Sequence, residues 1–186
     1  MTADGHHGLS CRYGSGRHVR HSQVNELISR AFTSAGTLAK LEPQSMCLGG
    51  NQRPDGVTLV PWKRGRCLAW DASTCPNTFA QSHIQASSSQ AGSAAATAEA
   101  KKVRKYASII GGVDFVPFAV ETSGVWGESA RELVSEIGRR ITAVSKDVRS
   151  TSFLRQRISV AVQRGNTACV LGTFPSNSHG EGTAVP

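Results

Sequence analysis

Four stretches of the chain place apolar residues at the spacing of an amphipathic helix. The first lies between Ser22, a candidate N-cap, and Gly36, a candidate stop, and its apolar stripe consists of Val24, Leu27, Ile28, Ala31, Phe32 and Ala35. Residues 91–108 are rich in alanine, with a basic C-terminal half, and form the second predicted helix. The third begins near Glu128, and the fourth spans about 152–172.

Shorter apolar runs without the helical period predict strands. One lies at 38–42, and two more, VTLVP and CLAWD, flank the turn-like segment WKRGR. The run 113–121 is almost continuously apolar, which predicts a central strand buried on both faces, although Pro117 removes one backbone donor. The order helix, three strands, helix, strand and two helices predicts an α/β fold with a mixed sheet flanked by helices.

The length of 186 residues fits one domain of ordinary size. Residues 74–93 show no apolar period and are expected to form a long loop. No run approaches the roughly 20 apolar residues that span a bilayer, and the first residues lack the features of a signal peptide. The five cysteines form no CxxC pair, which favours free thiols in a reducing compartment. We therefore expect an intracellular protein without a membrane partner.

The charge balance is basic. Lys and Arg total 21 against 13 for Asp and Glu, a net charge of +8. Cations laid along phosphates release counterions and gain affinity without sequence specificity, so a polyanionic partner is favoured. The alternative is a protein that is basic without such a partner, because charge alone identifies no chemistry.

Two aspartates lie at opposite ends of the predicted hairpin. A turn centred on Lys63 places Asp55 opposite Asp71, because the two lie equally far from it. Cross-strand partners have Cβ atoms about 5 Å apart, so the carboxylates repel each other unless a cation lies between them. Oxygen ligands suit Mg²⁺ or Mn²⁺, which polarise a phosphodiester and activate water. A one-residue change of register separates the pair, and each aspartate alone also fits a turn or a strand end.

The alanine-rich helix supplies a cation that could complete this set. One stripe of the helix contains Ala95, Ala98, Lys102, Tyr106 and Ile109. A cation on the packing side of a helix is costly unless it meets an anion, which makes Lys102 a third candidate. Lys105 points in a somewhat different direction and is the weaker choice. The alternative is that both lysines belong to a solvated basic face.

Several strings, taken in order, resemble a known nuclease family: RPDGVTLVPWKRGRCLAWD, TFAQSH, KVRKY and VPFAVETSGVWG. They are similar to the restriction-enzyme-like endonuclease domain at the C-terminal end of some non-LTR retrotransposon polyproteins. That domain has the PD-(D/E)xK fold, with a core order of helix, strands, helix and strand. Its signature is a Pro-Asp, a second Asp further along, and a Lys in a K-x-x-K-Y-like setting. The matching residues here are Pro54, Asp55, Asp71, Lys102, Lys105 and Tyr106, and the resemblance covers roughly 7–173.

The resemblance implies roles for these residues. Asp55 and Asp71 would ligate Mg²⁺ or Mn²⁺, while Lys102, and less well Lys105, would orient the attacking water or stabilise charge on the scissile phosphate. Glu42 is either a further metal-binding acid or an ordinary strand-end glutamate. The expected partner is DNA, with element RNA as a second candidate, and the expected nucleic-acid-binding residues are Arg53, Lys63, Arg64, Lys101 and Arg104. Arg53 also has the alternative of pairing with a carboxylate.

The N-terminal residues suggest a second metal site. His7 and Cys11, with His18 and His21 behind them, resemble the second half of the Cys/His zinc motif that precedes this nuclease. Zinc needs four ligands, and no cysteine pair precedes these residues, so the site is expected to be incomplete. The alternative is that His18 or His21 replaces a missing ligand. The expected organisation is a zinc-motif remnant at 1–19, the nuclease domain at 20–173 and a disordered tail at 174–186.

Two departures from the family bear on activity. The segment DASTCPN holds one extra residue after Asp71, with Asn77 where an Asp is common. The sequence also contains no paired-aspartate motif of a reverse transcriptase, which favours a truncated copy. The function implied is a nuclear endonuclease that nicks target DNA so that the free 3′ end primes reverse transcription. The alternative is an inactive remnant that binds nucleic acid through its basic face.

Overall fold

The computed structural model describes residues 8–9, 16–44, 53–73, 76–107 and 112–173. Within these residues the strands form one mixed sheet in the order β1-β2-β3-β4, with bounds Ala39–Leu41, Gly56–Thr58, Leu68–Ser73 and Asp114–Ala119. β2 runs antiparallel to both β1 and β3, and β4 runs parallel to β3. The predicted α/β class, a mixed sheet with helices, is confirmed.

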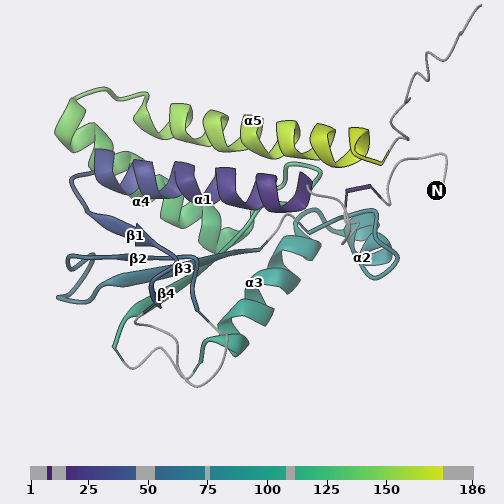
Figure 1. Cartoon of the computed structure of the whole chain (residues 1–186), viewed down its shortest axis with the longest axis horizontal. Coiled ribbons are helices and arrows are strands. Elements are labelled where there is room, and N and C mark those ends of the chain that lie inside the picture. The colour runs from purple at the N-terminus through teal and green to yellow at the C-terminus, as the bar shows by residue number, and fades with distance from the viewer. Residues whose placement is uncertain (1–7, 10–15, 45–52, 74–75, 108–111, 174–186) are drawn as a thin grey trace, which may run out of the picture.

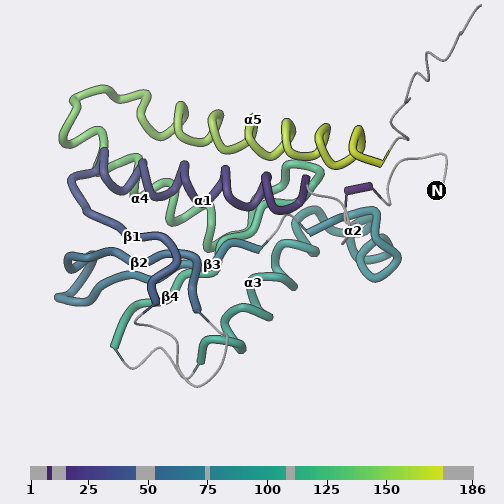
Figure 2. Tube along the Cα trace, in the orientation of Figure 1, coloured from purple at the N-terminus to yellow at the C-terminus, as the bar shows by residue number. Residues whose placement is uncertain are grey.

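The helices cover both faces of this sheet. Their bounds are Gly16–Ser34 for α1, Ile84–Ser89 for α2, Ser93–Lys105 for α3, Glu128–Ser145 for α4 and Ser150–Leu171 for α5. Figure 1 shows α1, α4 and α5 together above the sheet and α3 below it. The trace in Figure 2 shows how the chain leaves β3, passes through α2 and α3, and returns in β4. This crossover lets β4 run parallel to β3.

Alternation along the strands separates two environments. One face of the sheet contributes to the main hydrophobic core with α1, α4 and α5, through Leu68, Trp70, Ala72, Phe118 and Val120. The other face carries Asp71 and Phe115, and the Phe115 ring packs on Tyr106 just after α3, with centroids 4.7 Å apart. Side chains alternate between the two faces of a strand. Trp70 and Ala72 point to the core, so Asp71 between them points to α3.

Two buried glutamates fix the ends of the helices around the sheet. Glu121 Oε1 accepts a hydrogen bond of 3.1 Å from the N–H of Ala95, in the first turn of α3. Glu99, further along α3, accepts from the backbone N–H groups of Ser129 and Ala130 at the start of α4. Burial raises the pKa of Glu99, although these hydrogen bonds favour its ionised form. Carboxylates at helix N-termini satisfy otherwise unpaired donors, so α3 is held in place at two points.

Three sequence predictions about elements were wrong. Ser22 does not cap α1, which begins at Gly16, because the buried Arg20 packs against Gly165 of α5 and donates to Asn166. The expected loop at 74–93 contains α2 in its described part. Among the described strands β4 is an edge strand, not a central one, and its apolar run reflects α3 and α4, which pack on it. An edge position also accommodates Pro117.

The hairpin register and the turn segment WKRGR were predicted correctly, but the turn is not centred on Lys63. Gly56 pairs with Trp70 and Val57 with Ala69, the register expected for the hairpin, and Asp55 lies just before this ladder. The tip is a tight turn closed by a bridge between Lys63 and Arg66, with positive φ at the two residues between them. The β2 side of the hairpin has extra residues, 59–62, between the strand and this turn, so the turn is not centred on Lys63.

Candidate active site

Asp55 and Asp71, called here the carboxylate pair, meet at one end of the hairpin. Asp71 is a residue of β3, and Asp55 lies in a bend immediately before β2. The Oδ2 atom of Asp55 accepts a 2.7 Å hydrogen bond from the backbone N–H of Ala72. The Asp55 carboxylate therefore reaches the residue that directly follows Asp71.

Asp71 is held by two side chains from the end of α3. Its carboxylate is only 4% exposed and forms an ion pair with the ammonium group of Lys102, whose side chain is 24% exposed. Its other oxygen accepts a hydrogen bond from the hydroxyl group of Tyr106. Lys102 and Tyr106 lie four residues apart, so they share one face of the helix and its final turn. The prediction that Lys102 meets an anion is confirmed.

Tyr106 was expected to be a packing residue, but its hydroxyl group also contacts the site. Its side chain is fully buried, and its hydroxyl lies 2.6 Å from the carbonyl oxygen of Arg53, two residues before Asp55. Burial, and after it the hydrogen bond to Asp71, raises the pKa of Tyr106, so the hydroxyl stays protonated. Lys105 does not reach the carboxylate pair directly: its ammonium donates to the Tyr106 hydroxyl over 2.9 Å and lies 4.6 Å from the ring centroid.

Asp55 is approached from the opposite side by α1. His21 Nε2 lies 3.2 Å from Asp55 Oδ1. Burial alone would raise the pKa of Asp55, but the hydrogen bond from His21 and that from Ala72 outweigh it, and the pKa is lowered. The same hydrogen bond raises the pKa of His21 above 6.5 against the opposing effect of burial. Sequence reasoning considered His21 only for zinc, and the sequence holds no signal for its contact with Asp55.

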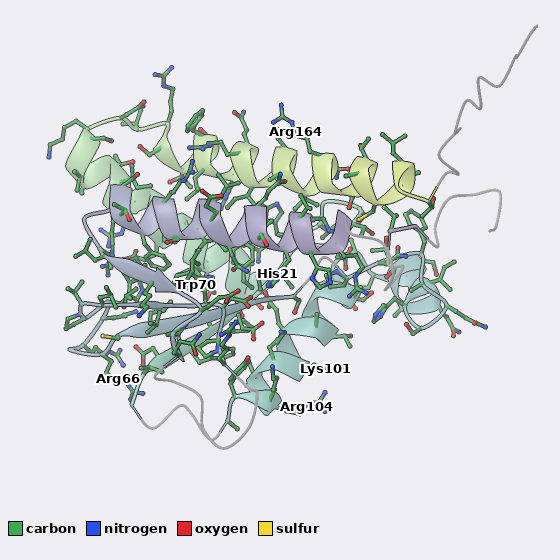
Figure 3. The ribbon with its side chains drawn as sticks, in the orientation of Figure 1. His21, Arg66, Trp70, Lys101, Arg104 and Arg164 are labelled. Atoms are coloured by element: carbon green, nitrogen blue, oxygen red, sulfur yellow. The ribbon has the colours of Figure 1, made fainter. Side chains whose placement is uncertain are left out.

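Among the contacts of the described residues, none joins the remaining candidates to the carboxylates of the pair. Glu42 pairs with Arg53, and its side chain is 67% exposed. Lys101 and Arg104 are exposed on α3, beside Lys102 (Figure 3). Lys63 and Arg64 are exposed at the hairpin tip, the end of the hairpin opposite to the carboxylate pair. The expected nucleic-acid-binding residues are therefore divided between two regions.

The donor set of the site fits a hard cation. Carboxylate oxygens are the preferred ligands of Mg²⁺, which usually binds through one or two carboxylates and completes its shell with water and substrate phosphate. The carboxylate pair offers this number of acids. Within the described ranges, no group of three or more His, Cys, Asp or Glu side chains is arranged to hold a metal ion, so Glu42 and His21 do not extend the set. His7 and Cys11 lie outside the described residues.

Comparisons with known proteins add no family. No protein-family model matches the chain, and a search of curated proteins finds no significant match. Among the described helices, none is both long and apolar enough to cross a membrane.

Proposed function

We propose that this chain is a metal-dependent DNA endonuclease domain of retroelement origin, with the restriction-enzyme-like PD-(D/E)xK fold. The observation that carries the proposal is the meeting of Asp55, Asp71 and Lys102, three residues from separate parts of the sequence, at one end of the sheet. The order α1, three strands, α3 and β4 agrees with the core order of that fold, and α2 is an addition between β3 and α3.

The reaction proposed is hydrolysis of one phosphodiester bond of duplex DNA. A Mg²⁺ or Mn²⁺ ion held by Asp55 and Asp71 would polarise the scissile phosphate and lower the pKa of a water molecule. Lys102 contributes a fixed positive charge next to Asp71, where it balances the carboxylates and can stabilise negative charge that develops on the phosphate. Tyr106 holds the Asp71 oxygen that Lys102 does not contact. The product is a nick whose free 3′ end can prime reverse transcription, and the proposed compartment is the nucleus.

Exposed cations beside the site support DNA as the substrate. Lys101 and Arg104 project from the same two turns of α3 that deliver Lys102. Charges of this kind contact phosphates without reading the sequence, so they suit an enzyme that must hold a backbone against its metal site. Lys63 and Arg64 at the hairpin tip would have to contact a different part of a long duplex.

The test of this function is nicking of supercoiled plasmid by the purified 186-residue chain with Mg²⁺ or Mn²⁺. The expected result is conversion to the open circular form by wild type and no conversion by Asp55→Ala or Asp71→Asn. EDTA should stop the reaction. The proposal fails if wild type and Asp55→Ala leave the plasmid equally intact.

A second candidate is a nuclease fold that only binds nucleic acid. The observation in its favour is that the exposed cations of α3 and of the hairpin tip need no metal to contact phosphate. Binding that weakens steeply with salt, without any cleavage in Mg²⁺ or Mn²⁺, would support this candidate over the first.

A further inference from the structure

His21 and Asn25 lie one turn apart on α1 and face the end of the hairpin where Asp55 lies. His21 Nε2 is 3.2 Å from Asp55 Oδ1, and the Asn25 amide nitrogen is 3.1 Å from the same imidazole nitrogen. Asn25 Oδ1 also accepts a 3.1 Å hydrogen bond from the indole of Trp70. Figure 3 shows His21 and Trp70 between α1 and the sheet. Asn25 also hydrogen-bonds Asp55, so a line of hydrogen bonds from Trp70 through Asn25 joins the buried core to one carboxylate of the pair.

The chemistry of these groups sets the direction of each bond. An indole N–H can only donate, so Asn25 presents its oxygen to Trp70 and its amide hydrogens toward Asp55. An ionised carboxylate can only accept, so His21 donates its Nε2 hydrogen to Asp55. The Asn25 amide also hydrogen-bonds Asp55 and favours its ionised form. Trp70 is fully buried, so its indole fixes the orientation of the whole line.

Asp55 needs such restraints because it lies outside the strand ladder. It occupies a bend before β2, and its carboxylate turns about two single bonds. The N–H of Ala72 holds Oδ2, and His21 holds Oδ1, so the two contacts together fix both torsions. Asp71, by contrast, has a regular strand backbone and is held by Lys102 and Tyr106.

We propose that His21 is a positioning residue of this site: it orients Asp55 for the divalent cation and does not itself touch the scissile phosphate. The inference rests on the proposed function and adds to it a residue from α1. Partners that orient a metal ligand typically contribute about 10–100-fold to metal affinity or activity. A carboxylate released from His21 keeps its charge but loses its fixed direction, so the loss should fall mainly on metal affinity.

The test compares His21→Ala, His21→Gln and Gln23→Ala in the full chain. Gln23 is an exposed residue of the same helix and serves as the matched control. Mn²⁺ binding is followed by the electron paramagnetic resonance signal of free Mn²⁺, and plasmid nicking is measured over a range of Mg²⁺ concentrations. Thermal unfolding followed by circular dichroism identifies any variant that does not fold.

His21→Ala should raise the metal concentration for half-maximal nicking by about 10–100-fold, with a smaller effect on the rate at saturating metal. His21→Gln should restore most of the affinity, because its amide N–H can donate in place of the imidazole, and Gln23→Ala should match wild type. Unchanged metal dependence in His21→Ala, or a folded His21→Gln no better than His21→Ala, overturns this inference alone. A wild type that neither binds Mn²⁺ nor nicks DNA overturns the proposed function and this inference with it.

Discussion

The ammonium group of Lys102 pairs with the carboxylate of Asp71, although the two residues come from different elements of the fold, α3 and β3. Among the ion pairs of the described residues, Lys102 supplies the positive charge that pairs with Asp71. The pair therefore balances a carboxylate that is almost completely buried.

Replacing Lys102 with Met should remove this balance while keeping most of the side-chain volume. We expect the free energy of unfolding to fall by about 1–3 kcal/mol, because Asp71 would keep its burial but lose a charged partner. Nicking should fall by about 10²-fold or more, since a fixed charge near the phosphate is lost. Urea unfolding and plasmid nicking measure the two effects, and Lys40→Met, at an exposed position of β1, is the control. Equal stability and rate in both variants would contradict the assigned role.

The contact between His21 and Asp55 leads to a prediction about how stability and the pKa of His21 depend on pH. The hydrogen bond to Asp55 raises the pKa of His21 above 6.5, so this contact stabilises the fold fully below pH 6.5 and is lost as pH rises through the raised folded-state value. Asp55→Asn should lower the pKa of His21, because burial would then act without the opposing carboxylate. The C–H resonances of His21, followed by NMR against pH in both proteins, give the two values directly. The same pKa in wild type and Asp55→Asn would count against the contact.

Tyr106→Phe isolates the hydroxyl group of a fully buried ring. The ring contact with Phe115 stays, whereas the hydroxyl that donates to Asp71 and lies against the carbonyl oxygen of Arg53 is removed. The expected loss is about 1–3 kcal/mol in the free energy of unfolding, together with a higher metal requirement for nicking. Urea unfolding with and without Mg²⁺ checks this. An unchanged unfolding midpoint would show that the hydroxyl contributes nothing to holding Asp71.

Gly56 follows Asp55 directly and is the first residue of β2, where a side chain would clash with Trp70. A Cβ atom at this position would lie 2.1 Å from the indole ring, which must then move. Gly56→Ala should cost about 1–3 kcal/mol of stability and disturb Asp55. Gly112→Ala is the control, because nothing lies within 4 Å of its added Cβ atom. Thermal unfolding of both variants distinguishes the two cases, and equal melting temperatures would contradict the close contact.

The two groups of exposed cations make separate contributions under the proposed function. Lys101→Glu combined with Arg104→Glu should reduce the slope of log affinity against log salt by about two, because two phosphate contacts are lost, and should strongly reduce nicking. Lys63→Glu combined with Arg64→Glu changes the same charge at the distant hairpin tip and should leave more of the nicking activity. Filter binding over a range of salt concentrations and the plasmid assay compare the double variants. Greater loss of nicking from the tip variant would place the duplex elsewhere.

The local pattern of the sequence was sufficient for most of the elements. Apolar spacing predicted the start of α4 and both ends of α5 to within two residues, and it predicted β1, β2 and β3 in order. It placed the start of α1 at Ser22 instead of Gly16, because the turn around Arg20 has no apolar stripe. That turn is helical because Arg20 packs on Gly165 and reaches Asn166, contacts between residues far apart in the chain.

The sequence by itself determined the register of the hairpin, Gly56 with Trp70 and Val57 with Ala69, since cross-strand register follows from the positions of the two apolar runs. It also determined that Lys102 points toward the sheet, because helical spacing puts it in line with buried alanines. Only the tertiary structure decided which residues surround the carboxylate pair. His21 reaches Asp55 because α1 crosses that end of the hairpin, and Tyr106 reaches Asp71 because Glu121 and Glu99 hold α3 against the sheet. Such contacts depend on how elements pack across long sequence separations, and no local period encodes them.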